Sequence, residues 1–332
     1  MPRFSIIIPV YNRPNEVDDL LASLAKQSVK NFEVVITEDG STIPCRDVCE
    51  RYSENIDIKY YTQENTGRSP ARNNSMEKAT GDYFVFFDSD CVIPATYFET
   101  LAKSLDDNWL DCFGGPDAAH DSFTDTQKAI NFAMTSFLTT GGIRGGKASM
   151  EKFTPRTFNM GFSREVYEKV GGFREMFSED IDMSKRIEAA EFKVGLIREC
   201  PVYHKRRVDF KKFYRQVHIF GKSRITLKLL YPGSLKIVHA LPACFVLGLV
   251  ILAILSVIIT PWFMAPIGVY IIMLFISAIL STKKLKVALM SVPASFIQLI
   301  GYGTGFIKAY FTKIIMGKGR DIEEEIQARK GK

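Results

Sequence analysis

The sequence predicts an α/β protein with a doubly wound, mostly parallel sheet, followed by an amphipathic helix and a helical membrane segment. Over the first 200 positions, short apolar runs alternate with amphipathic stretches of about a dozen residues, the pattern of strands and crossover helices. Acidic side chains follow several of these runs. The last third holds long apolar stretches without charged residues, as membrane spans do.

The strands and helices are predicted from the spacing of apolar residues. The run 83–87 is apolar throughout, so we expect a strand buried on both faces at the centre of the sheet. The first strand is predicted at 4–10, and Pro14 is allowed in the first turn of the helix after it. Further strands are predicted at 32–37, 58–61, 192–197 and 202–203, and further helices at 45–53, 69–79, 94–105, 163–171 and 178–190. Residues 111–157 show a looser pattern, and their glycines indicate either a flap over a site or an ordinary surface loop.

Two acidic residues directly follow the central strand. Asp88 and Asp90 lie one residue apart, and parallel sheets bind ligands at the carboxyl ends of their strands. Two close carboxylates repel each other and suit a hard divalent cation, and substrate phosphates commonly complete the shell of Mg²⁺. We therefore expect Asp88 and Asp90 to hold a metal-bound nucleotide, with a simple Asx turn as the alternative.

Acidic residues also occur at the end of another predicted strand and at the start of a predicted helix. Asp39 follows the second strand, and Glu179, Asp180 and Asp182 fall in the first turn of one helix. Acids in a first turn complement the helix dipole by about 0.3 to 1 kcal/mol each. Three of them exceed what that role needs, which favours a functional site over a purely structural one.

The charge is divided unevenly along the chain. Residues 1–200 carry 23 Lys and Arg against 32 Asp and Glu, whereas residues 201–332 carry 20 against 5. The basic residues flank long apolar spans and do not interleave with exposed aromatic residues, which favours anionic lipid over nucleic acid as a partner. The stretch 210–222 combines an apolar helical face with several lysines, so we expect a helix on the membrane surface, with a soluble amphipathic helix as the alternative.

Three apolar stretches are long enough to cross a bilayer. Residues 237–259 and 262–281 lack charged side chains, and a tight turn at Thr260 and Pro261 joins them. The third, 287–307, is interrupted by Pro293 and several glycines, so it either crosses fully or re-enters. Lysines after the second span place that end on the cytosolic side.

The compartment and the domain boundaries follow from these spans. The early apolar run 4–10 is too short for a signal peptide, so we expect the first half in the cytosol of a multi-pass membrane protein. The six cysteines lack metal-ligand or redox spacing and are expected to be reduced packing residues. The predicted divisions are a catalytic domain at 1–207, the amphipathic region at 208–235, the membrane segment at 236–311 and a charged tail at 312–332.

The ordered motifs of the first 200 residues together resemble those of the family 2 glycosyltransferases, which have the GT-A fold, a Rossmann-like, mostly parallel sheet. No one motif is specific, but their order and spacing are. The segments that carry the resemblance are Ser5–Asn12, Glu38–Ser41, Pro70–Asn73, Asp88–Asp90, Gly171–Phe173 and Glu179–Asp182.

The resemblance implies a nucleotide-sugar donor, UDP-linked in our prediction, and Mg²⁺ or Mn²⁺ as cofactor. Asp88 would contact the ribose or a metal-bound water, Asp90 would ligate the metal, and His204 would either complete the coordination or be structural. Ser89 lies between the two aspartates in the same donor-binding motif. The residues expected to contact the nucleotide base are Pro9, Val10, Tyr11 and Asp39, with Arg72 near the base or the diphosphate.

The same resemblance implies the catalytic base. Transfer with inversion needs a carboxylate within hydrogen-bond reach of the acceptor hydroxyl, on the face opposite the leaving group. Asp180 matches that base, Glu179 could exchange roles with it, and Asp182 is expected to anchor the loop. Asp88 and Asp90 would then lie on the other side of the sugar.

These residues predict a membrane-anchored, metal-dependent inverting glycosyltransferase acting on a glycan or lipid-linked glycan in cell-surface polysaccharide or glycoconjugate synthesis. Processive members carry Gln-x-x-Arg-Trp, whereas Ile219 and Phe220 follow Gln216 here, so we expect transfer of a single sugar. One alternative is a polyprenyl-phosphate glycosyltransferase. A second is a non-catalytic membrane assembly subunit.

Overall fold

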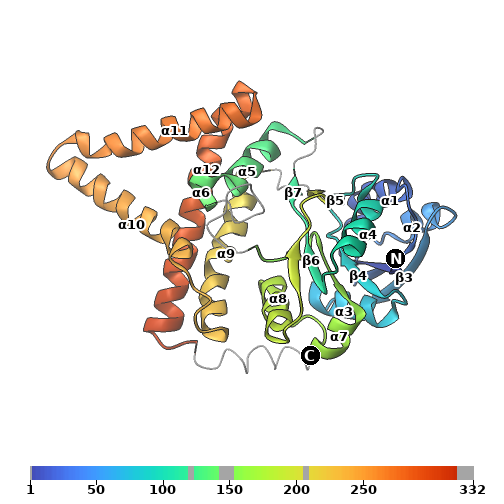
Figure 1. The fold of residues 1–332 in the computed structure, drawn as a ribbon. Helices are drawn as coiled ribbons and strands as arrows, with labels where there is room; N and C mark the ends of the chain where they lie inside the picture. The colour runs from blue at the N-terminus through green and yellow to red at the C-terminus, as the bar shows by residue number, and fades with distance from the viewer. Residues whose placement is uncertain (1, 119–122, 142–152, 205–208, 320–332) are drawn as a thin grey trace. The chain divides into compact units, whose positions relative to one another are not determined.

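The chain folds into two compact units. The structure, a computed structural model, describes residues 2–118, 123–141, 153–204 and 209–319 (Figure 1). The described part of the first unit, here called the sheet unit, lies within 1–120 and 153–205, and the second, the helical unit, within 121–152 and 206–325. The described residues 123–141 therefore group with the helical unit, whereas the sequence analysis predicted one catalytic domain over all of 1–207.

Among the described residues, seven strands form the main sheet in the order β3-β2-β1-β4-β8-β6-β9. β1 to β4 run parallel, β8 is antiparallel to both of its neighbours, and β9 is parallel to β6. The sheet is thus mostly parallel, as predicted. Its strands are β1 (Phe4–Val10), β2 (Phe32–Asp39), β3 (Asp57–Gln63), β4 (Tyr83–Phe86), β6 (Cys112–Gly114), β8 (Met160–Ser163) and β9 (Val194–Leu196).

Helices cover both faces of the sheet, because successive side chains of a strand point to opposite sides. Ile6 and Ile8 of β1 pack in one core with helices α1, α2 and α4, whereas Ile7 packs in the other with α3, α7 and α8. The predicted doubly wound architecture is therefore confirmed. The helices are α1 (Pro14–Ala25), α2 (Arg46–Tyr52), α3 (Arg68–Lys78), α4 (Tyr97–Asp107), α7 (Arg164–Val170) and α8 (Glu179–Ala189).

A small second sheet joins the segment after the central strand to the end of the sheet unit. It consists of β5 (Cys91–Val92), β10 (Val202–His204) and β7 (Asp117–Ala118), in that order. The register pairs His204 with Cys91, the residue after Asp90. The backbone of His204 is thereby brought beside the two aspartates.

In the part of the helical unit that the structure describes, three helices are long and apolar enough to cross a membrane: residues 237–258, 261–282 and 285–315. The first two expose many large apolar side chains, whereas the third is more buried, with 44% of its apolar stretch inside the protein compared with 11% for each of the others. The elements are α5 (Asp125–Thr135), α6 (Phe137–Thr140), α9 (Phe210–Leu230), α10 (Ile237–Ile258), η1 (Pro261–Met264), α11 (Ala265–Thr282), α12 (Leu285–Ala309) and η2 (Tyr310–Ile315).

The helical unit corrects several predictions. Part of the α9 face expected on the lipid surface is covered by protein: Phe213 and Val217 are fully buried against α5 and α12, whereas Tyr214 of the same face is 38% exposed. α12 continues through Pro293 without a break, so the re-entrant alternative finds no support. Helix α5 and strand β6 form in the stretch predicted to have a loose pattern, while residues 142–152 of that stretch lie outside the described residues.

The cysteines are free thiols, as predicted. Five are buried and pack in the sheet unit, whereas Cys244 of α10 is exposed.

Candidate active site

The predicted site residues gather at the carboxyl edge of the parallel strands. The register aligns Val10 of β1 with Glu38 of β2, and Asp39 with Gln63 of β3, so these strand ends share one edge of the sheet. β4 runs parallel to β1 and leads at the same edge into the segment that carries Asp88 and Asp90. Residues from distant parts of the chain therefore meet where ligands bind to such sheets.

Arg72 of α3 links the acids on the two sides of the site. Its Nη2 lies 2.8 Å from Oδ1 of Asp88, and its Nη1 lies 2.9 Å from Oε1 of Glu179. Arg72 is buried, and such a charge is tolerated only when it is paired, so the two carboxylates hold the guanidinium and the guanidinium fixes their spacing. Glu179 comes from α8, and Asp88 follows β4, so one side chain ties both elements together.

The second aspartate of the motif has its own arginine. Oδ2 of Asp90 lies 3.1 Å from Nη1 of Arg13, which precedes helix α1. The side chain of Asp90 is 14% exposed, that of Asp88 is 35% exposed, and Ser89 between them is buried. Both carboxylates are thus at least partly open to solvent and neutralised by different cations.

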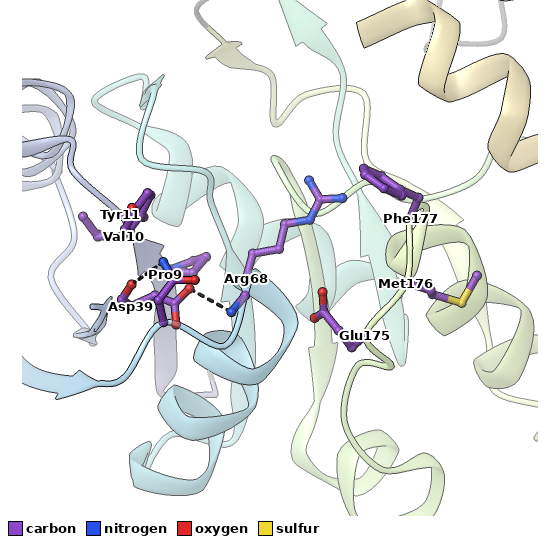
Figure 2. Close-up of a pocket in the computed structure, with 10 residues that line it drawn as sticks. Pro9, Val10, Tyr11, Asp39, Arg68, Glu175, Met176 and Phe177 are labelled. Atoms are coloured by element: carbon purple, nitrogen blue, oxygen red, sulfur yellow. Dashed lines mark hydrogen bonds between the residues drawn. The ribbon is translucent and has the colours of Figure 1, made fainter. Parts of the chain in front are cut away.

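The residues predicted to hold the nucleotide base line a pocket of about 440 Å³ (Figure 2). Figure 2 shows that the strand-end residues form one wall, the loop before α8 forms the opposite wall, and the Arg68 side chain extends between them. The pocket combines exposed aromatic rings with charged groups, as a ligand site commonly does. Its lining residues are Pro9, Val10, Tyr11, Asp39, Asn65, Gly67, Arg68, Glu175, Met176 and Phe177.

Asp39 shapes one wall of this pocket through its hydrogen bonds. Its Oδ1 accepts from the backbone N–H of Thr66, and its Oδ2 accepts from the backbone N–H of Gly67, both at 2.9 Å. Asp39 is buried, so these bonds satisfy its charge and hold the loop that leads into α3. Its carboxylate therefore fixes the shape of the pocket as well as lining it.

Arg68 is a site residue that the sequence analysis missed. It is the first residue of α3, lines the pocket, and donates from Nη2 to Oε2 of Glu179 at 2.8 Å. Desolvation lowers the pKa of Arg68, but the carboxylates of Glu179, Asp88 and Asp180 together raise it above its ordinary value. Arg68 thus links the pocket to Glu179, and Glu179 is in turn linked to Asp88 through Arg72, which connects the pocket with both predicted acid groups.

The three acids of α8 have different environments. Glu179 is buried, with one oxygen at Arg72 and the other at Arg68. Asp180 is partly exposed; its Oδ1 accepts from the N–H of Ile181 and its Oδ2 lies 3.4 Å from Arg156.

Asp182 anchors the loop before α8, as predicted. It is buried between Arg174 at 3.3 Å and Arg186 at 3.0 Å, and Arg186 also donates to the carbonyl of Gly172. The loop that forms one pocket wall is thereby fixed to the helix that carries the acids.

The predicted metal ligands fit a hard cation by the chemistry of their donors. Asp88 and Asp90 present carboxylate oxygens, the donors that Mg²⁺ and Mn²⁺ favour. The described side chains contain no group of three or more His, Cys, Asp or Glu that could hold a metal ion, and the side chain of His204 lies outside them. The role of each residue stays a prediction.

The sheet with helices on both faces, and a pocket with carboxylates at its strand ends, define a doubly wound α/β domain with a ligand site at the usual edge of the sheet. Residues 5–171 match the family described as Glycosyl transferase family 2. The chain belongs to that family.

Individual relatives agree with this assignment. Glycosyltransferase GlyA of Streptococcus pneumoniae is 40% identical over 104 residues, which are 31% of this chain and 15% of GlyA. The uncharacterized glycosyltransferase EpsJ of Bacillus subtilis is 26% identical over 205 residues, 60% of this chain and 57% of EpsJ. The chain thus spans less than two thirds of the length of these relatives.

A solved structure shares the fold. It is the mannosyltransferase PcManGT from Pyrobaculum calidifontis, in complex with GDP-Man and Mn²⁺, with a TM-score of 0.59 over 94% of this chain and 88% of that chain. At 16% sequence identity, the likeness shows the fold alone.

Proposed function

We propose that the chain is a membrane-anchored inverting glycosyltransferase that moves one sugar from a nucleotide sugar to a glycan or lipid-linked glycan in cell-surface polysaccharide or glycoconjugate synthesis. The observation that carries this proposal is the Arg72 bridge between Asp88 and Glu179. It holds the acids assigned to the donor and those assigned to the acceptor at one edge of the sheet, and fixed positioning supplies much of a transfer enzyme's rate.

The pocket supports the donor assignment. Tyr11 is half exposed there and offers an aromatic face to a nucleotide base, while the carboxylate of Asp39 offers acceptor oxygens to its N–H groups. We prefer a UDP-linked donor, and the GDP-Man bound to PcManGT makes GDP-linked sugars the next to test.

Asp88 and Asp90, with His204 beside them in the sheet register, are the residues that would hold Mg²⁺ or Mn²⁺. When bound, such a cation neutralises the charge that develops on the departing diphosphate. The Mn²⁺ in PcManGT supports this assignment.

Asp180 is our candidate for the general base. Both oxygens of Glu179 are held by arginines, so its movement towards an acceptor would break the buried ion pair with Arg72 and the partly exposed one with Arg68. Asp180 is partly exposed and its contact with Arg156 at 3.4 Å is long, so it can accept the proton of the acceptor hydroxyl. Arg72 and Arg68 then act as positioning residues, because they hold Glu179, the residue directly before Asp180.

The apolar helices support the membrane anchor. α10 and α11 expose large side chains such as Ile254, Val257 and Ile272, which lipid would cover. We retain the proposed multi-pass topology with the catalytic domain in the cytosol.

One alternative acceptor is polyprenyl phosphate, whose oxygen is already anionic and needs no base. Replacement of Asp180 should therefore leave transfer to polyprenyl phosphate nearly unchanged but should slow transfer to an alcohol. A non-catalytic assembly subunit would bind partners without turnover.

The test is a donor screen with the full chain purified in detergent. Labelled UDP- and GDP-linked sugars are incubated with Mn²⁺, Mg²⁺ or EDTA, and binding and slow hydrolysis are measured. We expect one donor to bind and to be hydrolysed with a divalent cation. Absence of any donor interaction with either cation contradicts the proposal.

A further inference from the structure

The two aspartates after the central strand are paired with different arginines. Asp88 contacts Arg72 at 2.8 Å, and Asp90 contacts Arg13 at 3.1 Å. Two carboxylates one residue apart repel each other, so a cation at each lowers the free energy of the donor-free site. The two arginines thus neutralise the negative charge that a divalent cation would neutralise when bound.

The two arginines differ in how easily they can leave. Arg72 has a side chain only 2% exposed and a second carboxylate, Glu179, at 2.9 Å. Arg13 has a side chain 34% exposed, and its second carboxylate, Glu16, lies at 3.9 Å. Release of Arg72 would leave buried charges unpaired, whereas Arg13 can move into solvent at a much smaller free-energy penalty.

Arg13 is also close in sequence to a pocket residue and to a helix N-terminus. It follows the strand-end turn that contains Tyr11, a residue of the pocket, and it precedes Pro14 in the first turn of α1. A guanidinium at a helix N-terminus is well suited to a diphosphate, because both the dipole and the paired N–H donors attract it.

We propose that Arg13 is a displaceable counter-cation: it neutralises Asp90 in the donor-free enzyme, yields Asp90 to the divalent cation, and then contacts the diphosphate of the donor. This inference rests on the proposed function and adds a positioning residue to it. Asp88 keeps Arg72 throughout, so Asp90 is the carboxylate that changes its partner.

A thermodynamic consequence follows. A metal ion alone must displace Arg13 from Asp90 and leaves it only the longer contact with Glu16, whereas in the presence of a nucleoside diphosphate the released guanidinium gains a new anionic partner. Metal and diphosphate therefore bind with positive coupling, and the coupling is reciprocal. Removal of the guanidinium should raise the affinity for the metal alone and reduce this coupling.

The test measures Mn²⁺ binding to the full chain in detergent, by electron paramagnetic resonance, with and without saturating UDP, and with GDP in parallel. We expect the wild-type chain to bind Mn²⁺ about 10-fold more tightly when the nucleotide is present, within the usual range of coupling between sites. In Arg13→Ala, binding of Mn²⁺ alone should tighten by about 10-fold and most of the coupling should disappear. Arg13→Lys should keep part of it.

The control is Arg51→Ala, which removes another solvent-exposed ion pair, with Asp18 at 3.3 Å, and should behave as the wild type. Equal Mn²⁺ affinity and equal coupling in Arg13→Ala and the wild type overturn the inference. Nucleotide binding is recorded in the same samples by calorimetry. Absence of nucleotide binding to the wild type means that the proposed function itself fails, whereas nucleotide binding with unchanged coupling in the variant refutes only the role of Arg13.

Discussion

The sheet unit and the helical unit bury different kinds of polar residue. The buried charged residues of the sheet unit are Glu33, Glu38, Asp39, Arg72, Glu179 and Asp182. In the described part of the helical unit, the buried polar residues are Gln127, Thr139, Ser223, His239, Ser291, Ser295 and Gln298, none of which is Asp, Glu, Lys or Arg. Among the described residues, charge is therefore buried only in the sheet unit, mostly around the proposed site and also at Glu33 near the start of β2, although burial of charge is unfavourable unless it is paired.

The helical unit is held together by close backbone packing instead. A Cβ atom at Gly305 of α12 would lie 2.0 Å from the carbonyl oxygen of His218, and one at Gly221 of α9 would lie 2.0 Å from that of Tyr302. Small residues permit this approach of two helices, as they do in membrane proteins. The comparison teaches that charged residues specify the site in one unit, while shape specifies the packing in the other.

The largest expected effect comes from replacing Asp180. This variant separates the loss of activity from a loss of stability in the sheet unit. Asp180→Asn keeps the shape of the side chain but removes the proposed base, so transfer to an alcohol acceptor should fall about 10² to 10⁴-fold. The melting temperature should not change. Initial rates with the identified donor measure the effect, and Asp57→Asn, which alters an exposed ion pair with Arg3, is the control. Near-full activity of Asp180→Asn would favour the polyprenyl-phosphate acceptor.

A second pair of variants compares the loss of a buried polar group in each unit. Arg72→Met leaves Asp88 and part of Glu179 unpaired and should reduce the free energy of unfolding by about 3 to 5 kcal/mol. Gln298→Leu removes an Oε1 atom that has no hydrogen-bond partner among the described residues, so it should be neutral or stabilising by about 1 kcal/mol. Denaturant unfolding in detergent compares the two, and equal losses would break the contrast between the units.

A third experiment addresses the shape-dependent packing. Gly305→Leu forces a side chain against the backbone of α9 and should destabilise the helical unit by about 1 to 3 kcal/mol. Gly248→Leu in α10 is the matched control, because a Cβ atom there meets nothing within 4 Å. Thermal melting in detergent measures both variants, and nucleotide binding should survive in each. Equal melting temperatures would mean that the close crossing contributes little.

The smallest expected effect is a difference in acid sensitivity. Burial raises the pKa of Glu33, but the hydrogen bonds from Lys59, Ser5 and Thr80 together outweigh burial and lower the pKa to about 2. Because this folded value lies below the ordinary value of 4.5, the stabilisation is present above pH 4.5 and is lost as the pH falls towards 2. The helical unit buries no such carboxylate among its described residues, so it should resist acid better.

The two tryptophans allow this difference to be measured in the full chain. Trp262→Phe leaves Trp109 to report on the sheet unit, and Trp109→Phe leaves Trp262 to report on the helical unit. We expect the Trp109 fluorescence to change at the higher pH. A single transition, seen at the same pH by both reporters, contradicts the comparison.

The parallel core could be predicted because its signals are local. The apolar run 83–87 and the helical spacing after Pro14 each fit within one element, and both elements form where expected. Helix α5 was missed although Thr124 and Gln127 form a capping box, a pattern that is visible in the sequence. Strand β6 has three residues, too few to show a period.

Sequence reasoning named the acids of the site and Arg72, but it missed Arg68, Arg13 and the contacts that the arginines make. The acids stand out because they follow apolar runs or crowd a helix start. Arg72 and Glu179 are 107 positions apart, so their contact depends on the fold and has no local signature. Arg68 and Arg13 were passed over for a similar reason, since surface arginines are common and only the folded chain shows which carboxylates they face.

The assignment of α5 to the helical unit has a practical consequence for expression. The polypeptide leaves the sheet unit near residue 120, contributes α5 to the other unit, and returns near 153 to add β8, α8 and β10. No single truncation therefore yields either half intact. A soluble catalytic fragment needs an excision of about this insert and a designed linker in its place, in addition to a stop after His204.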